Sequence, residues 1–475
     1  MPASTHALSS SLTVPLQDLA ALPNSPVPAD FAAAPDLRRI LDGQRTSCWT
    51  IGGLGLVGFG RAAHVLVTGE DRFTAARAWW DTLTSGLKIT DPVHRSATGP
   101  VAFGAFTFAR SSPTSSGLVL PELVVGHDDD GAWVTLVSTA PTLTVADVAA
   151  AWSRWIPTVR PIGEPTRAHL TSSDAVPSAS DVAPVAQENP AADRAWCAAV
   201  ADGVGLIADG QLDKLVLARR VEVRAQTEHL DLPGALRALA ADYNTCWTYC
   251  VCVEEHRDPT VNRLFGATPE RLVRVLNGRL HARVLAGTLD RRSVPAGMDE
   301  SRWARENLLE DAKQRAEHDF AITSLLDSVS AYTDDVVSSP GPFVLELPNV
   351  WHLASDVTAE LRPGPDGSVP SALELVEAVH PTAAVCGTPT QPAAEAITRL
   401  EGLDRGLYAG PVGWLDARHN GDFGIALRGG VQRDARTAHV YAGCGVVEAS
   451  VPEDELAETQ AKLRPVLGAL GVIPR

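Results

Sequence analysis

The stretch His380-Pro-Thr-Ala-Ala-Val-Cys-Gly-Thr-Pro389, followed by Glu401-Gly-Leu-Asp-Arg-Gly-Leu-Tyr-Ala-Gly-Pro-Val-Gly-Trp414, decides the fold of this chain. Both segments are dense in Gly and Pro, which interrupt helices and strands, and between these lie His, Thr, Arg and Tyr. Loops held by a rigid scaffold often carry function. The two segments are therefore expected to border a functional site.

Short apolar runs separated by turns predict strands on both sides of these loops, and runs with helical period predict helices. The predicted strands are 101–108, 133–137, 214–223, 247–254 and 271–275, and the predicted helices are 191–209, 301–332 and 453–467. Hairpin-like strands outnumber strict strand–helix alternation. This indicates a mixed α/β (α+β) protein with largely antiparallel sheets.

The long helix 301–332 has an apolar stripe that includes Leu308, Phe320 and Leu325. Residues three and four positions apart share one face of a helix, so these side chains are expected to point into the core.

A glycine-rich segment, Gly53-Leu-Gly-Leu-Val-Gly58, matches the dinucleotide-binding pattern G-x-G-x-x-G. That pattern binds a nucleotide only where a strand precedes it and a helix opens from it. Here Val65-Leu-Val67, which resembles a strand, follows. We therefore predict a tight hairpin at this position.

Composition predicts how the chain is organised. Residues 1–28 are rich in Ser, Pro and Ala and are expected to form a flexible tail, and 157–190 reads as a loop. Residues 29–190, which include this loop, and residues 191–475 then read as two halves of the chain.

The formal net charge of −17 argues against binding of nucleic acid, since neutralising phosphates needs clustered Lys and Arg. An anionic small molecule would need a bound cation or local Arg and Lys residues. No apolar run approaches the ~20 residues of a membrane-spanning helix. The seven cysteines match neither a zinc site nor a disulfide framework, so reduced thiols and a cytoplasmic location are expected.

Glu455, Glu458 and Lys462 share one face of the predicted final helix. A solvated face with a Glu–Lys pair is the ordinary explanation of such spacing. The preceding run contains Gly443 and Gly445, where a ligand could approach the backbone closely.

The long helix offers another carboxylate, Glu317. Two helices that each present a carboxylate could hold Mg²⁺, which binds one or two carboxylates with water and substrate oxygens. Arg428 could bind a carboxylate with two hydrogen bonds, although an ion pair on an edge strand is the more common explanation of such a residue.

The ordered motifs resemble the chorismate-utilising enzymes, and the isochorismate synthases most of all. Besides the two opening segments, the resemblance rests on Leu212-Asp-Lys-Leu-Val-Leu-Ala-Arg219, Phe265-Gly-Ala-Thr-Pro-Glu-Arg-Leu272 and Leu285-Ala-Gly-Thr288. It covers about 280 residues, several long motifs in the same order, while the N-terminal half matches more loosely. It implies that both halves belong to one large domain, residues 29–475, of stacked antiparallel sheets flanked by helices, with 191–475 as its catalytic part.

The resemblance also implies a role for each matching residue. Lys214 matches the general base and Glu270 the general acid. The implied Mg²⁺ ligands are Glu317, Glu455 and Glu458. The implied substrate contacts are Thr288, His380, Tyr408, Arg428, Gly443 and Lys462.

The implied reaction is that of an isomerase: water adds at C2 of chorismate and the C4 hydroxyl leaves, which gives isochorismate. A lysine base must be neutral, and a carboxylic acid donor must stay protonated, which burial favours. The product feeds menaquinone or siderophore biosynthesis.

Two positions separate this chain from relatives that use ammonia or an amine. Lys214 is present, which favours water, and Ala286 stands where an amine-transferring relative carries a lysine. No glutaminase subunit is therefore expected.

Salicylate synthases share Lys214 and Glu270 and are therefore the main alternative. They differ in that they go on to eliminate pyruvate. A binding relative without turnover is the non-enzyme alternative, and the presence of both Lys214 and Glu270 speaks against it. Gln314 departs from the resemblance, since relatives usually have an acidic residue there, near the metal.

Overall fold

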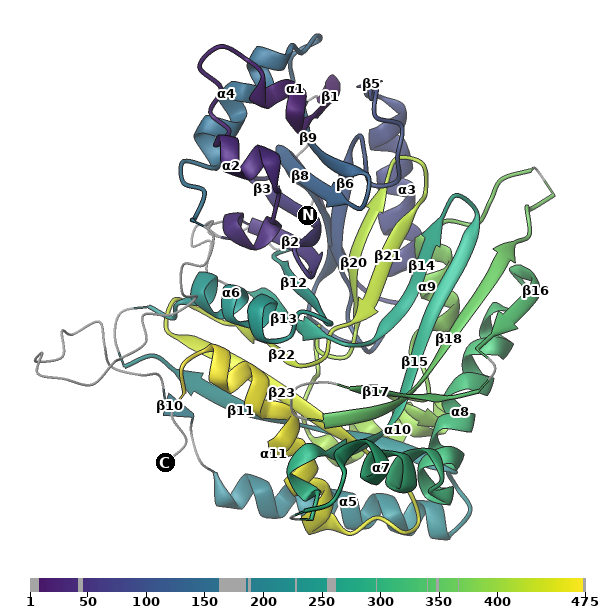
Figure 1. Cartoon of the computed structure of the whole chain (residues 1–475). Helices are drawn as coiled ribbons and strands as arrows, with labels where there is room; N and C mark the ends of the chain where they lie inside the picture. Colours follow the sequence, from purple (N-terminus) through teal and green to yellow (C-terminus); the bar gives the residue numbers. More distant parts are fainter. Residues whose placement is uncertain are drawn as a thin grey trace, which may run out of the picture.

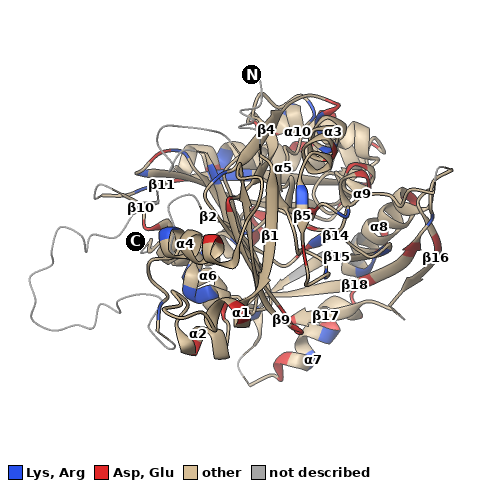
Figure 2. Ribbon diagram, turned by 90° about the horizontal axis from the view of Figure 1, so that it is seen from above, with Lys and Arg blue, Asp and Glu red and all other residues tan. Residues whose placement is uncertain are grey.

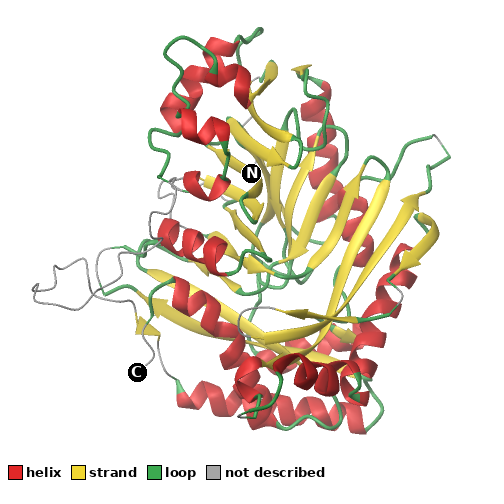
Figure 3. Ribbon diagram, in the orientation of Figure 1, coloured by secondary structure: helices red, strands yellow, loops and turns green. Residues whose placement is uncertain are grey.

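The structure, a computed structural model, describes residues 8–41, 46–161, 185–186, 189–226, 229–253, 262–295, 297–339, 341–346, 350–365 and 367–472. Within these residues the chain forms two large sheets with helices packed on them (Figures 1 and 3). All strand pairs are antiparallel except β1 with β5. The predicted fold class, a mixed protein with large antiparallel sheets, is confirmed.

The first sheet contains thirteen strands among the described residues. In spatial order they are β10 (Val185–Ala186), β11 (Lys214–Arg224), β23 (Thr437–Val446), β22 (Gly429–Gln432), β13 (Arg263–Thr268), β12 (Trp247–Val251), β2 (Thr46–Ile51), β3 (Leu54–Phe59), β8 (Leu123–Asp128), β9 (Gly131–Ser138), β1 (Ser10–Pro15) and β5 (Lys88–Thr90), with β19 (Gly387–Thr388) paired to β11.

The second sheet contains ten strands in the same part of the chain. Their order is β16 (Thr333–Ser338), β18 (Val350–Leu361), β15 (Arg279–Asp290), β14 (Arg271–Leu276), β21 (Gly421–Ile425), β20 (Pro411–Asp416), β6 (Val101–Ala105), β7 (Ser116–Leu120) and β4 (Ala63–Val67), with β17 (Phe343–Glu346) paired to β18.

The helices cover the two sheets in separate groups. Contacts place α5, α6, α10 and α11 on the first sheet and α3, α8 and α9 on the second. The helices are α1 (Leu16–Ala20), α2 (Ala29–Ala33), η1 (Leu37–Ile40), α3 (Arg72–Ser85), α4 (Val145–Trp155), α5 (Pro190–Ala208), α6 (Leu232–Asp242), η2 (Arg291–Ser293), α7 (Glu300–Ala304), η3 (Arg305–Leu309), α8 (Ala312–Val329), α9 (Ala372–Val379), α10 (Thr390–Glu401) and α11 (Pro452–Ala469).

The N-terminal and C-terminal halves share both sheets. Strand β12 pairs with β2 in the first sheet, and β20 pairs with β6 in the second. Side chains from the two sheets, such as Trp49 and Phe423, belong to one buried cluster. Burial of this apolar surface is the main force that holds the layers together.

The glycine-rich segment is a hairpin, as predicted. Ile51 pairs with Leu54, so Gly52 and Gly53 alone form the turn between β2 and β3. Their φ angles are +57° and +88°. A two-residue hairpin turn with positive φ at both positions favours glycine, which explains the composition without any nucleotide.

The predicted helix 301–332 is wrong as a single element. It is broken into α7, the π-helical turn η3, and α8, which starts after Asp311. The Asp311 carboxylate accepts a hydrogen bond from the Gln314 backbone N–H at 2.9 Å, so it caps a new helix and ends the old one. Phe320, which was predicted to point into the core, is 37% exposed, whereas His318 and Ala321 are buried.

The predicted flexible tail is also wrong for most of its length. Strand β1 is buried and pairs with β9 and β5, because Leu12 and Val14 alternate into the core. Residues 1–7 lie outside the described residues, as does most of the predicted loop 157–190.

None of the helices formed by the described residues is long and apolar enough to cross a bilayer. In the view of Figure 2, Lys and Arg are interspersed with Asp and Glu over the helices and strand ends that are drawn. This distribution gives no basic stripe of the kind that tracks a nucleic-acid backbone.

Candidate active site

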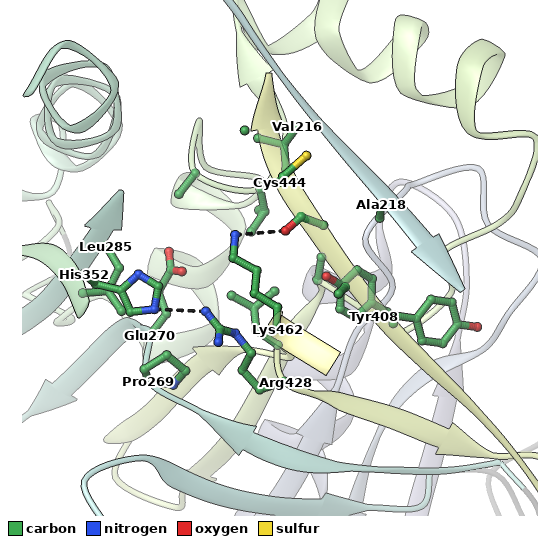
Figure 4. Close-up of a pocket in the computed structure, with 18 of the residues that line it drawn as sticks. Val216, Ala218, Pro269, Glu270, Leu285, His352, Tyr408, Arg428, Cys444 and Lys462 are labelled. Atoms are coloured by element: carbon green, nitrogen blue, oxygen red, sulfur yellow. Dashed lines mark hydrogen bonds between the residues drawn. The ribbon is translucent and has the colours of Figure 1, made fainter. Parts of the chain in front are cut away.

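A cavity lies where β11 and β23 of the first sheet approach β15 and β18 of the second. The cavity opens to solvent, and its wall combines polar and apolar side chains, as is usual for small-molecule sites. Glu270, His352 and Arg428 gather on one side, and Lys462 extends beside them (Figure 4). The lining also includes Tyr408, Gly443 and Arg405.

Glu270 enters the cavity from the tight connection between β13 and β14. Its backbone N–H donates to Thr268 Oγ1 at 3.2 Å, and its carbonyl accepts from the Ile425 N–H at 3.2 Å. The side chain is buried, and burial raises the pKa of the carboxyl to about 8, against the opposing effect of Lys214, Arg428 and Lys462. The carboxyl is therefore largely protonated at neutral pH, as a general acid requires.

Lys214 is the first residue of β11 and is fully buried. Its backbone is fixed on the side of β19, where it pairs with Thr388. The lysine acts electrostatically on Glu270 and lies outside the set of residues that line the cavity. The two predicted catalytic residues are thus brought within electrostatic range of each other, from different strands.

Arg428 lies between β21 and β22, and it is buried. Its φ of +50° is a conformation that residues with a Cβ rarely adopt. The guanidinium Nη2 lies 3.0 Å from His352 Nε2. The alternative of an ion pair on an edge strand does not apply, because β22 pairs on both sides and Arg428 faces the cavity.

Lys462 reaches the cavity from α11. Its Nζ donates to the Gly443 carbonyl oxygen at 3.0 Å and lies 2.5 Å from Glu458 Oε1. Gly443 of β23 pairs with Ala218 of β11, and a Cβ at this position would lie only 2.7 Å from the Leu217 carbonyl oxygen. The glycine is thus required by close packing of the strands, and its position leaves the backbone accessible to a ligand.

Tyr408 stacks on Tyr441, with ring centroids 4.9 Å apart. Both rings line the cavity, and burial raises the pKa of the Tyr408 hydroxyl. The hydroxyl therefore stays protonated and available as a donor.

His380 caps the end of α9 and packs edge-on against Phe108. Its Nε2 donates to the Ala409 carbonyl at 3.1 Å, and Ala409, rather than His380, lines the cavity. Burial lowers the pKa of His380 to about 3, so the ring is neutral. Thr288 lies in β15 opposite His352, and its side chain lies outside the described part of the structure.

A model of the chorismate binding enzyme family matches residues 47–471. The chain belongs to the chorismate-binding enzyme family. It is 30% identical to isochorismate synthase MenF of Bacillus subtilis over 80% of this chain and 77% of that protein. It is 30% identical to the salicylate biosynthesis isochorismate synthase of Pseudomonas aeruginosa over 91% of this chain and 86% of that protein.

Solved structures agree on the fold of this family member. The menaquinone-specific isochorismate synthase MenF of Escherichia coli superposes with a TM-score of 0.69, over 98% of this chain and 96% of that one, at 22% identity. The architecture that carries Glu270 and Lys214 is thus the family architecture.

Two of the predicted metal ligands, Glu455 and Glu458, lie on α11, the helix from which Lys462 reaches the cavity. Glu455 is buried and accepts a hydrogen bond from Ser450 Oγ at 2.7 Å, and Glu458 pairs with Lys462. The side chain of Glu317 lies outside the described part of the structure. Within the described part, no group of three or more His, Cys, Asp or Glu side chains is close enough to hold a metal ion.

Gln314 of α8 lies beside Gly287, which is part of the cavity wall. A Cβ on Gly287, which lines the cavity, would lie 2.7 Å from Gln314 Oε1. This oxygen is buried and has no hydrogen-bond partner among the described residues. Glu455, Glu458 and Gln314 all offer side-chain oxygen atoms, the ligands that a hard cation such as Mg²⁺ prefers.

Two further residues of the site were not predicted. His352 is the single histidine of β18, 76 positions from Arg428, and no spacing in the sequence points to it. Arg405 falls in the second opening segment, where its ion-pair partner Glu401 precedes it by one helical turn. That i, i+4 spacing was the signal available for the pair.

Proposed function

We propose that this member of the family is an isochorismate synthase that adds water at C2 of chorismate and removes the C4 hydroxyl. The observation that carries the proposal is Glu270: a buried carboxyl with a pKa of about 8 faces the cavity, with Lys214 in electrostatic range. A protonated acid and a buried amine are the pair that such an exchange of hydroxyl groups needs.

The positive groups around the cavity suit a dianionic substrate. Chorismate carries a ring carboxylate and an enolpyruvyl carboxylate, while the chain as a whole has a net charge of −17. Arg428 and Lys462 supply local positive charge at the cavity. Tyr408 and the Gly443 backbone would supply further polar contacts, and Thr288 and His380 remain predicted contacts from the resemblance.

Lys214 and Glu270 divide the proton transfers between them. In the proposed reaction Lys214 is the base that takes a proton from the water that attacks C2. Glu270 gives its proton to the C4 hydroxyl, which leaves as water while the ring double bonds shift. Arg428 and Lys462 hold the substrate in register, since orientation of the reacting atoms accounts for much of the barrier reduction in such sites.

Mg²⁺ would be held by Glu317, Glu455 and Glu458, with Gln314 as a neighbouring oxygen donor. The bound ion would supply positive charge for the ring carboxylate of the substrate. The buried Gln314 oxygen and the paired Glu458 fit this requirement.

Salicylate synthase is the second candidate, since it shares Lys214 and Glu270. We place the enzyme in the cytoplasm, because its seven cysteines are free thiols. We also expect it to act without a glutaminase subunit.

The decisive experiment incubates the protein with chorismate and Mg²⁺ and separates the products by chromatography. Isochorismate alone is the expected result. Salicylate with pyruvate would move the assignment to the second candidate, and unchanged chorismate would refute both. Thorough chelation with EDTA should abolish turnover, and activity that survives chelation would contradict the metal site.

A further inference from the structure

A second, smaller cavity meets the first at Glu270. Its lining includes Arg271, Arg283 and Thr382, and it shares two walls, Glu270 and Ala384, with the main cavity. Glu270 therefore borders two spaces. One space takes the substrate, while the other is just large enough for about one water molecule.

Thr382 provides an unusual polar group in the wall of the small cavity. The residue is 9% exposed, and its Oγ1 has no hydrogen-bond partner among the described residues. Its backbone carbonyl, in contrast, accepts hydrogen bonds from the Val385 and Cys386 N–H groups, which fixes the turn of the chain that follows Thr382. A buried hydroxyl without a protein partner commonly indicates an ordered water molecule.

The small cavity also approaches solvent. Arg283 retains 25% of its side-chain exposure while it pairs with Asp356 at 2.7 Å. Arg271 pairs with Asp422 at 3.0 Å. Both guanidinium groups are thus already paired with carboxylates. The rest of the wall is apolar apart from Thr382 and Glu270, which are therefore the polar groups there that can bind a water molecule.

We propose that the small cavity is the path by which Glu270 regains its proton, through a water molecule bound to the Thr382 hydroxyl. This inference rests on the proposed function, in which Glu270 loses a proton in every turnover. The catalytic cavity is filled by product at that moment, so a path that avoids it has a clear use.

After each turnover Glu270 must regain a proton, either from solvent along such a path or directly from Lys214. Each turnover leaves Glu270 as a carboxylate and Lys214 as an ammonium. The water at Thr382 donates one proton to Glu270 and recovers one from bulk water at the outer wall. Lys214 releases its proton to solvent, so no net proton is gained. Direct return from Lys214 to Glu270 is the competing route.

The charged and titratable groups that face Glu270 come from several elements. They are Lys214 on β11, Arg428 before β22, Lys462 on α11, His352 on β18, and Arg271 and Arg283 on the side of the small cavity. Thr382 is uncharged, so its replacement by valine removes the hydroxyl without adding or removing a charge.

The test compares wild type with Thr382→Val, Thr382→Ser and the control Thr50→Val, using Mg²⁺-loaded enzyme and chorismate. Thr50 is likewise a buried threonine whose Oγ1 has no partner among the described residues, but it lies in β2, away from both cavities. We expect Thr382→Val to lower kcat by about tenfold or more with kcat/KM nearly unchanged, because the return of the proton to Glu270 follows product formation.

Thr382→Val should also show a larger solvent deuterium isotope effect on kcat. Thr382→Ser should restore kcat, and Thr50→Val should match wild type. Wild-type kcat and isotope effect in Thr382→Val would overturn the proposal and favour direct return from Lys214. Equal losses in kcat and kcat/KM that serine does not restore would also overturn it, since they indicate a packing role. A wild-type enzyme that makes no isochorismate would instead refute the proposed function.

Discussion

Arg428 Nη2 lies 3.0 Å from His352 Nε2, and this contact fixes the tautomer of the histidine. A guanidinium can only donate hydrogen bonds, so Nε2 must accept. His352 Nδ1 then carries the proton and donates to the Gly287 carbonyl at 3.2 Å. Burial, assisted by Arg428, holds the pKa of His352 well below its usual value, so the ring stays neutral.

His352→Phe should therefore weaken substrate binding while the fold is kept. The substitution keeps an aromatic ring and removes the acceptor that orients Arg428. A hydrogen bond to a charged group is worth ~1.5–3 kcal/mol, so kcat/KM should fall about tenfold to a hundredfold. His439→Phe, on β23 and outside the cavity lining, is the matched control. Unchanged kinetics, or a protonated His352 in ¹⁵N NMR spectra at pH 7, would contradict the assignment.

Glu270→Gln should change how stability depends on pH. The pKa of Glu270 is raised from 4.5 to about 8 in the folded state. Its favourable contribution is therefore complete below pH 4.5 and is lost as pH rises through 8. Between these values the wild type loses about 1.4 kcal/mol per pH unit through this group, and glutamine does not.

Urea denaturation at pH 5, 6, 7 and 8 measures this effect. The free energy of unfolding of Glu270→Gln, relative to wild type, should rise steadily with pH. Glu360→Gln, at a residue whose side chain is 59% exposed, serves as the control. A constant difference across the four pH values would mean that Glu270 is ionised in the folded enzyme. Wild-type kcat should also fall above about pH 8, as the acid loses its proton.

The strand and helix that carry part of this site could be predicted, because the spacing of apolar residues within each segment marks them. The strand at 214–223 and the final helix follow from apolar spacing and lie close to β11 and α11. Arg428 and Lys462 were predicted and line the cavity. Pairing of β11 with β23 joins residues over 200 positions apart, and local spacing does not encode it. His352 was missed for the same reason.

Two elements of the fold, the helix 301–332 and the strand β1, were predicted incorrectly, and each error has a cause in the local sequence. Asp311 ends a helix whose apolar pattern continues past it, because a cap competes with the pattern. The strand β1 was concealed by a composition rich in Ser and Pro, yet its burial against β9 outweighs that composition.

Lys214→Met should abolish most turnover and leave the fold intact. Methionine has a similar length, and the side chain it replaces is fully buried. Loss of a general base costs about 10²–10⁴-fold in kcat. Arg224→Met, at the exposed far end of the same strand, should retain activity. Circular dichroism checks the fold, and near-normal kcat in Lys214→Met would show that another group activates the water.

The buried pair Arg405–Glu401 braces the strand that carries Lys214. Arg405 Nη2 donates to the Val216 carbonyl at 2.7 Å, and Glu401 Oε1 accepts from the Ala218 N–H at 2.7 Å. The side chains are 2% and 0% exposed, and Arg405 Nη1 also donates to the Val385 carbonyl at 2.8 Å. Val216, Ala218 and Val385 all line the cavity, so the pair holds the cavity wall in place.

Breaking this pair from either side should cost about 3–5 kcal/mol of unfolding free energy, because the remaining charge is buried without compensation. Arg405→Met combined with Glu401→Gln should cost less than the sum of the two single changes, since no buried charge remains and glutamine can still accept from the Ala218 N–H. Urea denaturation of the four proteins measures this coupling. The exposed pair Arg302–Glu306 has the same i, i+4 spacing, and its removal should leave the midpoint unchanged. Additive single changes at Arg405 and Glu401 would show that the two side chains act independently on β11.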